Sequence, residues 1–292
     1  MKKYLIVILF ILFSNSVFGA DYLNQSVRGK DEIRSDEGFS MWIATKSTES
    51  TTTMPIIFNL NFIDSNANDF NYGNDFTAIN SPTYSRVNSV YYADLELDSG
   101  QYFSRANGTW DNNLVNGFSV IALIKLESGV GVNRYFVSKY LYDGTTPANN
   151  ELEFAFLKDS NEYLNLLIYD NSVCQSGTLT YIGRRTSVAM ALDTWYLVIG
   201  IYYPDAGTSA DVNLYQIKLS DLTTSEDVAD SEANAGSFVA IEDSDTAMVV
   251  GGYTSTGAFD GIIGFAEVTE AILANSETTN SLAQIYKGRL GL

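Results

Sequence analysis

The sequence predicts an all-β protein, built as a two-sheet antiparallel sandwich with one short C-terminal helix. Three observations lead to this fold class. Apolar and polar residues alternate in many short runs, clusters of Asp, Asn, Gly and Ser separate the runs, and no helical period is sustained until the C-terminal end. Hydrophobic residues make up 46% of the chain, which is enough for one large core.

The N-terminus has the features of a secretory signal peptide. It begins with Lys2 and Lys3, continues with apolar residues 4–13 and ends with small and polar residues 14–20, so cleavage is expected after Gly19 or Ala20. An apolar run of about ten residues, at ~1.5 Å each, reaches only about half of a ~30 Å hydrocarbon core. A buried N-terminal helix is the alternative. We expect a secreted, periplasmic or cell-surface protein with no stable membrane span after cleavage.

Residues 21–53 form a polar preface that ends in Lys46-Ser-Thr-Glu-Ser-Thr-Thr-Thr. This composition cannot build a core and is typical of an N-terminal segment and linker. The sandwich domain is therefore predicted to occupy residues 54–292, a length that is ordinary for a single all-β domain.

Charge and composition exclude several functions. The formal net charge is −18, and loss of Lys2 and Lys3 with the signal peptide changes it to −20. This charge repels nucleic acid, anionic glycans and anionic lipid, and it attracts divalent cations. The absence of histidine excludes the usual zinc sites and every His-dependent triad. Cys174, the single cysteine, is expected to be a buried thiol, with an intermolecular disulfide as the alternative.

The predicted strands follow one another along the domain. Residues 56–62 place three apolar side chains on one face and two asparagines on the other. Residues 118–126 are apolar on both faces, as in a central strand that is covered on both sides. Further strands are expected at residues 93–98, 101–103, 151–157, 163–169, 195–203 and 210–219.

The C-terminal region combines a glycine-rich turn with a final strand. Residues 249–250 end an apolar run, residues 251–261 supply turn chemistry, and residues 262–268 are expected to pair back on the first run as a hairpin. The helix is expected to open at Asn275 or Ser276 and to stop at Gly288. Its buried side is expected to carry Leu282, Ile285 and Tyr286.

Several motifs occur in an order that indicates a family. They are Asp64-Ser-Asn-Ala-Asn-Asp, Leu95-Glu-Leu-Asp-Ser-Gly-Gln-Tyr, Gly117-Phe-Ser-Val-Ile-Ala-Leu-Ile-Lys, Asp193-Thr-Trp-Tyr-Leu-Val and Phe259-Asp-Gly-Ile-Ile. Together they resemble the laminin G-like, concanavalin A-like lectin-glucanase superfamily. The resemblance implies a jelly-roll sandwich that is closed by the last strand. The sequence departs from the family at one place. Relatives often carry an acidic residue close to the isoleucine of the last motif, whereas here Ile263 and Gly264 follow Ile262.

The resemblance also implies recognition as the function. A module of this kind binds carbohydrate or a surface protein without catalysis, through loop aromatics and the concave face. Here the ligand-binding candidates are Trp110, Tyr142, Asp143 and Tyr253. The alternative for each aromatic is packing over the edge of the sandwich.

Catalysis is the competing function, with a structural or adhesion component as a third. The resemblance implies that β-glucan hydrolases of this fold place three acids at alternate positions of one strand. The nearest pattern is Glu151, Glu153 and Ala155, and the third position carries no carboxylate. Polysaccharide lyases of the same architecture use histidine, which this chain lacks. We therefore expect a non-catalytic protein.

A structural calcium ion is the candidate cofactor. Asp64, Asn66 and Asn68 place oxygen-bearing side chains at alternate positions, and oxygen is the ligand that calcium prefers. A plain Asx-rich turn is the alternative, because Asp69 stands where an EF-hand loop needs glycine. A second acidic stretch, residues 221–245, is expected to be a solvated loop.

Overall fold

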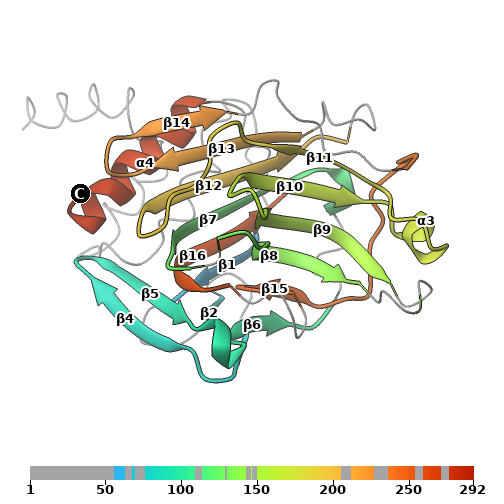
Figure 1. Cartoon of the computed structure of the whole chain (residues 1–292), viewed down its shortest axis with the longest axis horizontal. Helices are drawn as coiled ribbons and strands as arrows, with labels where there is room; N and C mark the ends of the chain where they lie inside the picture. The colour runs from blue at the N-terminus through green and yellow to red at the C-terminus, as the bar shows by residue number, and fades with distance from the viewer. Residues whose placement is uncertain are drawn as a thin grey trace, which may run out of the picture. The chain divides into compact units, whose positions relative to one another are not determined.

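The computed structural model confirms the predicted fold class, with two antiparallel sheets packed face to face and one C-terminal helix (Figure 1). It describes residues 56–62, 68–69, 76–108, 114–128, 130–142, 146, 150–204, 212–226, 236–253, 259–270 and 276–292, without the side chains of 56–59, 61, 68–69, 225–226 and 276–278. The predicted signal peptide, residues 1–20, and linker, residues 21–53, lie outside this description.

Sheet A contains nine strands. They are β1 (Ile56–Asn61), β2 (Asn68–Asp69), β4 (Thr83–Val87), β5 (Val90–Leu95), β7 (Phe118–Leu126), β12 (Trp195–Tyr202), β13 (Val212–Lys218), β14 (Thr223–Glu226) and β16 (Gly261–Thr269). Their order is β14-β13-β12-β7-β16-β1-β2, and β5 pairs with both β16 and β4. The central position of β7 agrees with its prediction as a strand that is covered on both faces.

Sheet B contains seven strands in the order β11-β10-β9-β8-β15-β6-β3. They are β3 (Thr77–Ile79), β6 (Tyr102–Arg105), β8 (Arg134–Leu141), β9 (Glu151–Lys158), β10 (Leu164–Tyr169), β11 (Tyr181–Arg185) and β15 (Met248–Val250). Short 3-10 helices occupy Leu97–Ser99 and Leu114–Asn116, and the α-helices are α3 (Asn171–Gln175) and α4 (Ser276–Leu290). In sheet B no strand was predicted at β3, β8 or β11, and the helix α3 was not predicted either.

The predicted C-terminal hairpin is wrong. Strand β15 pairs with β6 and β8 in sheet B, whereas β16 lies between β7 and β1 in sheet A. Two glycines make the transfer between sheets possible, Gly251 with φ +83° and Gly261 with φ +138°. A Cβ atom would collide with the Leu95 side chain at the first position and with the Lys125 carbonyl oxygen at the second. Only glycine fits such close approaches at positive φ.

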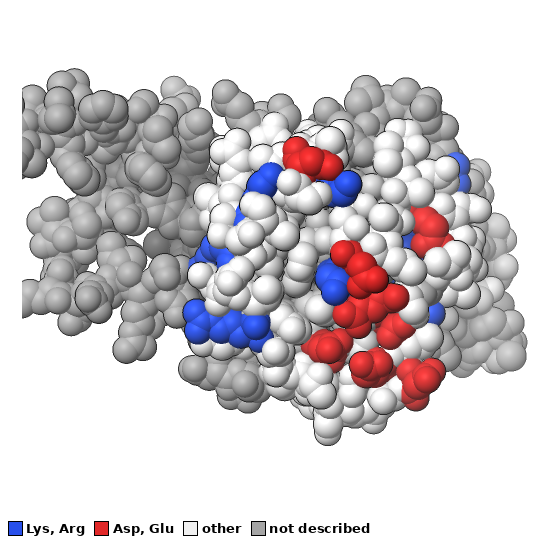
Figure 2. Space-filling model, turned by 60° about the vertical axis from the view of Figure 1, so that its left-hand side comes forward, with Lys and Arg blue, Asp and Glu red and all other residues white. Residues whose placement is uncertain are grey.

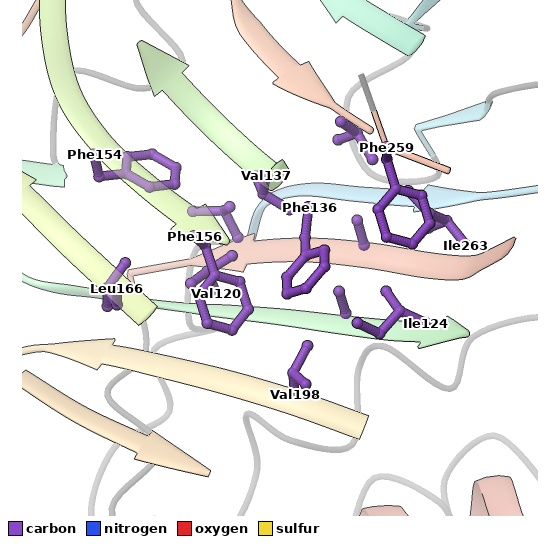
Figure 3. Close-up of a cluster of buried hydrophobic side chains, with 14 of the residues drawn as sticks. Val120, Ile124, Phe136, Val137, Phe154, Phe156, Leu166, Val198, Phe259 and Ile263 are labelled. Atoms are coloured by element: carbon purple, nitrogen blue, oxygen red, sulfur yellow. The ribbon is translucent and has the colours of Figure 1, made fainter. Parts of the chain in front are cut away.

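The core lies between the two sheets. Figure 3 shows the rings of Phe136 and Phe156 from sheet B directed towards Val120 and Val198 from sheet A. The two rings meet edge to face, with centroids 5.8 Å apart and an angle of 84°. Phe259 adds a second edge-to-face contact with Phe136 at 5.6 Å. Such geometry stabilises a packed aromatic core by about 0.5–1.5 kcal/mol per pair beyond area burial.

Helix α4 packs on the outer face of sheet A. The Tyr286 ring stacks on Phe265 of β16 with centroids 4.8 Å apart. Ile285, expected on the buried side, is 37% exposed, and the buried apolar positions are Leu282, Ala283, Tyr286 and Leu290.

The helix also continues past its predicted end at Gly288. The turn between β4 and β5 satisfies its last carbonyl groups: Asn88 Nδ2 donates to the Leu290 oxygen at 2.5 Å, and the Ser89 N–H donates to the Arg289 oxygen at 3.1 Å. Helix ends need such partners, and here the fold supplies them two residues beyond the glycine.

Among the described residues, none of the helices has the length and the apolar composition that a membrane span requires.

Acidic side chains gather at the end of the sandwich where β5, β7 and β16 meet. Lys125 lies 3.5 Å from Glu127 and 3.4 Å from Asp193, and Figure 2 shows acidic side chains grouped around basic ones on this side of the molecule. Burial raises the pKa of Asp94, and the charges of Glu127 and Glu96 raise it further. This end of the domain therefore repels anionic partners.

Candidate functional site

The outer face of sheet B carries a set of packed tyrosines, called here the tyrosine cluster. Tyr140 lies at its centre, with ring centroids 5.8 Å from Tyr135, 6.5 Å from Tyr142, 5.2 Å from Tyr169 and 5.3 Å from Tyr253. A sixth member, Tyr181, lies 5.5 Å from Tyr169. These residues come from β8, β10, β11 and the segments that follow β8 and β15.

A β-bulge brings Tyr135 and Tyr140 to the same face. They are five positions apart, so strict alternation would place them on opposite faces of the sheet. In the β8–β9 ladder Tyr135 pairs with Leu157 and Val137 pairs with Phe156, which leaves Phe136 as an extra residue. Phe136 and Val137 both enter the core, so the inward and outward positions of the strand are exchanged beyond them. Tyr140 therefore faces the same side as Tyr135.

Cross-strand pairing adds Tyr169 and Tyr181. They stand directly opposite each other in the β10–β11 ladder, and their rings contact edge to face. Aromatic cross-strand pairs stabilise a sheet by about 0.2–1 kcal/mol. The floor beside the rings is apolar and consists of Ala155, Leu157 and Leu167.

Three tyrosines of the cluster reach solvent and three do not. Tyr142 is 47% exposed, and Tyr181 and Tyr253 are partly exposed, whereas Tyr135, Tyr140 and Tyr169 are buried. The exposed rings therefore rest on buried rings. Side chains that are fixed in this way lose little conformational entropy when they contact a ligand.

All the buried phenols are neutral near physiological pH. Burial raises the pKa of Tyr135 to about 12, and it raises the pKa values of Tyr140 and Tyr169 well above the usual range. The neighbouring tyrosines add to each increase, and a hydrogen bond between Tyr140 and Tyr169 lowers the pKa of Tyr140 in part. The buried base of the cluster therefore carries no charge.

A second polar network lies where β9 begins and β10 ends. In this network, carboxylates accept hydrogen bonds from the backbone of residues 236–246, called here the carboxylate-bound segment. The backbone N–H groups of Val239, Ser244 and Asp245 donate to the carboxylates of Asp170 at 3.0 Å, Glu153 at 3.2 Å and Glu151 at 3.2 Å. The predicted solvated loop over residues 221–245 is wrong for β14, whereas residues 236–245 form no helix or strand and most of them are exposed.

A buried ion pair anchors this network. Lys139 Nζ lies 2.7 Å from Glu153 Oε2 and 2.9 Å from Asp243 Oδ1, and the side chains of Lys139 and Glu153 are both 0% exposed. The other Glu153 oxygen is buried without a hydrogen-bond partner. Burial is the main reason that the pKa of Glu153 rises from 4.5 to about 7, and Lys139 opposes the increase.

Glu151, Glu153 and Ala155 do not share one face. Lys139 pairs with Phe154 and Tyr140 pairs with Leu152 in the β8–β9 ladder. Glu153, between Leu152 and Phe154, has no pairing partner on β8 and forms a β-bulge. Ala155 packs with the tyrosine cluster, while Glu153 is enclosed with Lys139. The Glu151 carboxylate accepts from Asn171 at 3.2 Å and from Gln175 at 3.0 Å. The three-position arrangement of a retaining glucanase is therefore not formed on this strand.

Two of the predicted ligand-binding residues, Tyr142 and Tyr253, lie in the tyrosine cluster and both contact Tyr140. Trp110 and Asp143 lie outside the described residues. Tyr135, Tyr140, Tyr169 and Tyr181 were not among the predicted ligand-binding residues. The repeated tyrosines of residues 134–142 were a signal, but the bulge obscured their common face.

Of the predicted calcium ligands, Asp64 and Asn66 lie outside the described residues. The backbone of Asn68 pairs with Asn61 in the β1–β2 ladder, and its side chain is outside the description. Across the described ranges, no group of three or more Cys, Asp or Glu residues is arranged to hold a metal ion. The calcium site stays a prediction.

No family model matches this sequence, and no curated protein matches it either. Solved structures match its fold. Domain 4 of AbnA, a GH43 extracellular arabinanase from Geobacillus stearothermophilus solved with arabinotriose, has a TM-score of 0.51 and 12% identity over 79% of this chain and 99% of that domain.

Two further structures match shares of longer chains. The binding domain of Paraclostridial Mosquitocidal Protein 1 has a TM-score of 0.54 and 10% identity over 80% of this chain and 52% of that one. The sialidase of Trypanosoma rangeli, solved with sialic acid, has a TM-score of 0.53 and 12% identity over 82% of this chain and 34% of that one. At these identities the likeness establishes the β-sandwich fold alone.

Proposed function

We propose that this domain is an exported carbohydrate-recognition module that binds a glycan on its tyrosine cluster without cleaving it. The observation that carries the proposal is the arrangement of Tyr142, Tyr181 and Tyr253 at the surface above three buried tyrosines. Aromatic rings offer flat apolar area to the C–H faces of sugar rings, and phenol hydroxyls bond to sugar hydroxyls. The signal-peptide features of residues 1–20 support export.

The charges around the cluster favour a neutral glycan. Three basic side chains of the neighbouring strands are paired with carboxylates: Lys139 with Glu153 and Asp243, Lys158 with Glu162, and Arg185 with Asp159. The protein as a whole carries a net charge of −18. An anionic sugar would meet net repulsion here, whereas a neutral sugar would not.

The hydrogen bonding of the two glutamates supports binding over hydrolysis. Glu153 is enclosed with Lys139, and Glu151 is engaged by Asn171, Gln175 and the backbone of Asp245. A glycosidase needs two carboxyl groups that flank the scissile bond and are open to substrate. The match in fold to an arabinanase domain that was solved with arabinotriose gives further support to sugar binding.

A glycan array with the purified domain, followed by calorimetry on the best neutral hit, tests the proposal. Tyr142→Ala and Tyr253→Ala are each expected to weaken binding about tenfold or more, by about 1.4 kcal/mol, because each removes an exposed ring. Tyr203→Ala is the matched control, since Tyr203 is a partly exposed tyrosine just after β12 in the other sheet. Release of reducing ends from the hit, abolished by Glu153→Gln, would refute the non-catalytic part.

A further inference from the structure

The outer face of β10 and β11 continues beyond the tyrosine cluster. In β11 the residues on this face are Tyr181, Gly183 and Arg185, because Ile182 between them enters the core. Opposite them in β10 stand Tyr169, Leu167 and Asn165, respectively. From Tyr181 to Arg185 the strand advances about 13 Å, at ~3.3 Å per residue. This distance is longer than one sugar ring.

The surface between Tyr181 and Arg185 is low and apolar. Gly183 has no side chain, and a Cβ atom added there would lie 2.4 Å from the Leu166 carbonyl oxygen and 2.8 Å from Leu167 Cδ2. Leu167 therefore covers the glycine and forms a shallow aliphatic floor that is partly exposed. A sugar ring lies flat on such a floor, whereas a larger side chain at position 183 would interrupt it.

The far end of this floor carries a stacked arginine. The Arg185 guanidinium lies 4.9 Å from the centre of the Tyr163 ring, and its Nη1 is 3.6 Å from Asp159 Oδ2. The side chain of Arg185 remains 34% exposed. Stacking fixes the plane of the guanidinium, and the adjacent carboxylate compensates its charge. Such a group presents oriented N–H donors to sugar hydroxyls without selecting an anion.

We propose that Arg185 and Tyr163 form a second sugar subsite, connected to the tyrosine cluster by the Leu167 floor. The module then binds an internal stretch of an uncharged oligosaccharide along β11, and a single terminal sugar occupies only part of the site. This inference depends on the proposed function, since it extends the same binding face.

The dependence of affinity on ligand length tests the subsite. The probes are neutral arabinan, mannan and β-glucan oligosaccharides, each from disaccharide to hexasaccharide, measured by calorimetry with the full domain. Affinity in the recognised series is expected to rise with length until both subsites are filled. Arg185→Ala is expected to lower the affinity for the longest ligand about tenfold, and to leave the affinity for the disaccharide within twofold.

Two variants make the result specific. Tyr163→Leu removes the stacking partner and is expected to act like Arg185→Ala. Arg184→Ala is the matched control, because Arg184 is the adjacent arginine on the opposite face of β11, across from Leu166. It is expected to retain wild-type affinity for every ligand.

The subsite and the proposed function fail in different ways. If Arg185→Ala leaves the affinity for the hexasaccharide unchanged while Tyr142→Ala abolishes binding, the second subsite is wrong and the proposed function stands. If affinity does not increase beyond the disaccharide, the subsite is equally refuted. If the folded wild-type domain binds no oligosaccharide of the panel, the proposed function and the subsite are overturned together.

Discussion

Replacement of Lys139 by methionine removes the counter-ion of a fully buried carboxylate. Lys139 Nζ lies 2.7 Å from Glu153 and 2.9 Å from Asp243, and the side chains of Lys139 and Glu153 are both 0% exposed. Methionine keeps the unbranched shape of the lysine stem, so the change tests charge more than packing. Loss of one partner of a buried pair costs about 3–5 kcal/mol, and we expect this loss in the free energy of unfolding at pH 8.

The loss should depend on pH. Burial raises the pKa of Glu153 from 4.5 to about 7, so the folded state binds its proton more tightly than the unfolded state. The contribution of Glu153 to stability is then fully present below about pH 4.5 and disappears as the pH rises through about 7, a difference of about 3 kcal/mol. Without Lys139 the pKa of Glu153 rises further. Protonation relieves the unpaired charge at low pH, so the deficit of Lys139→Met should be smallest near pH 5.

Urea unfolding of both proteins at pH 5 and pH 8 measures this deficit. The double variant Lys139→Met with Glu153→Gln is the control, because it removes both charges and should recover part of the loss at pH 8. A deficit that is equal at the two pH values, or an absence of recovery in the double variant, would show that the buried charge of Glu153 does not cause the loss.

Three further predictions concern the fold. Gly251→Ala should destabilise the domain more than the control Gly131→Ala, because both glycines have positive φ but only an alanine at position 251 would place a Cβ against Leu95. In urea unfolding, Gly131→Ala should lower the free energy of unfolding by about 1 kcal/mol. Deletion of the chain from Phe259 onward removes β16 from the middle of sheet A, and calorimetry should show no cooperative transition; a sharp transition would contradict this topology. Cys174 is buried, and burial raises its pKa, so a thiol reagent should label it only in denaturant; rapid labelling of native protein would show that this region opens.

The fold class was predictable because alternation and turn residues record local geometry. The run 118–126 was apolar on both faces, and β7 is indeed central and buried. The helix start at Ser276 followed from its capping chemistry, whereas its end depended on Asn88 and Ser89, which are far away in the sequence. The predicted hairpin failed because a short apolar run does not specify the sheet in which it pairs.

The candidate site was predictable only in part. Tyr142 and Tyr253 were selected as loop aromatics, and the fold brings both against Tyr140, which the sequence reasoning did not select. Two bulges in the β8–β9 ladder account for most of the difference. One turns Tyr135 to the face of Tyr140, and the other turns Glu153 away from that face. A bulge changes the phase of a strand without a clear sequence signal, so alternation alone misplaces every residue beyond it.

The position of the bound glycan decides whether the tyrosine cluster is the binding site. Tyrosine rings labelled with carbon-13 give separate NMR signals that can be assigned by single Tyr→Phe variants and followed as the best neutral oligosaccharide is added. We expect the ring signals of Tyr142, Tyr181 and Tyr253 to shift together and to saturate at one affinity, while those of Tyr203 and Tyr91 stay in place. Saturable binding that leaves the rings of the tyrosine cluster unchanged, or that shifts rings of sheet A instead, would contradict this expectation.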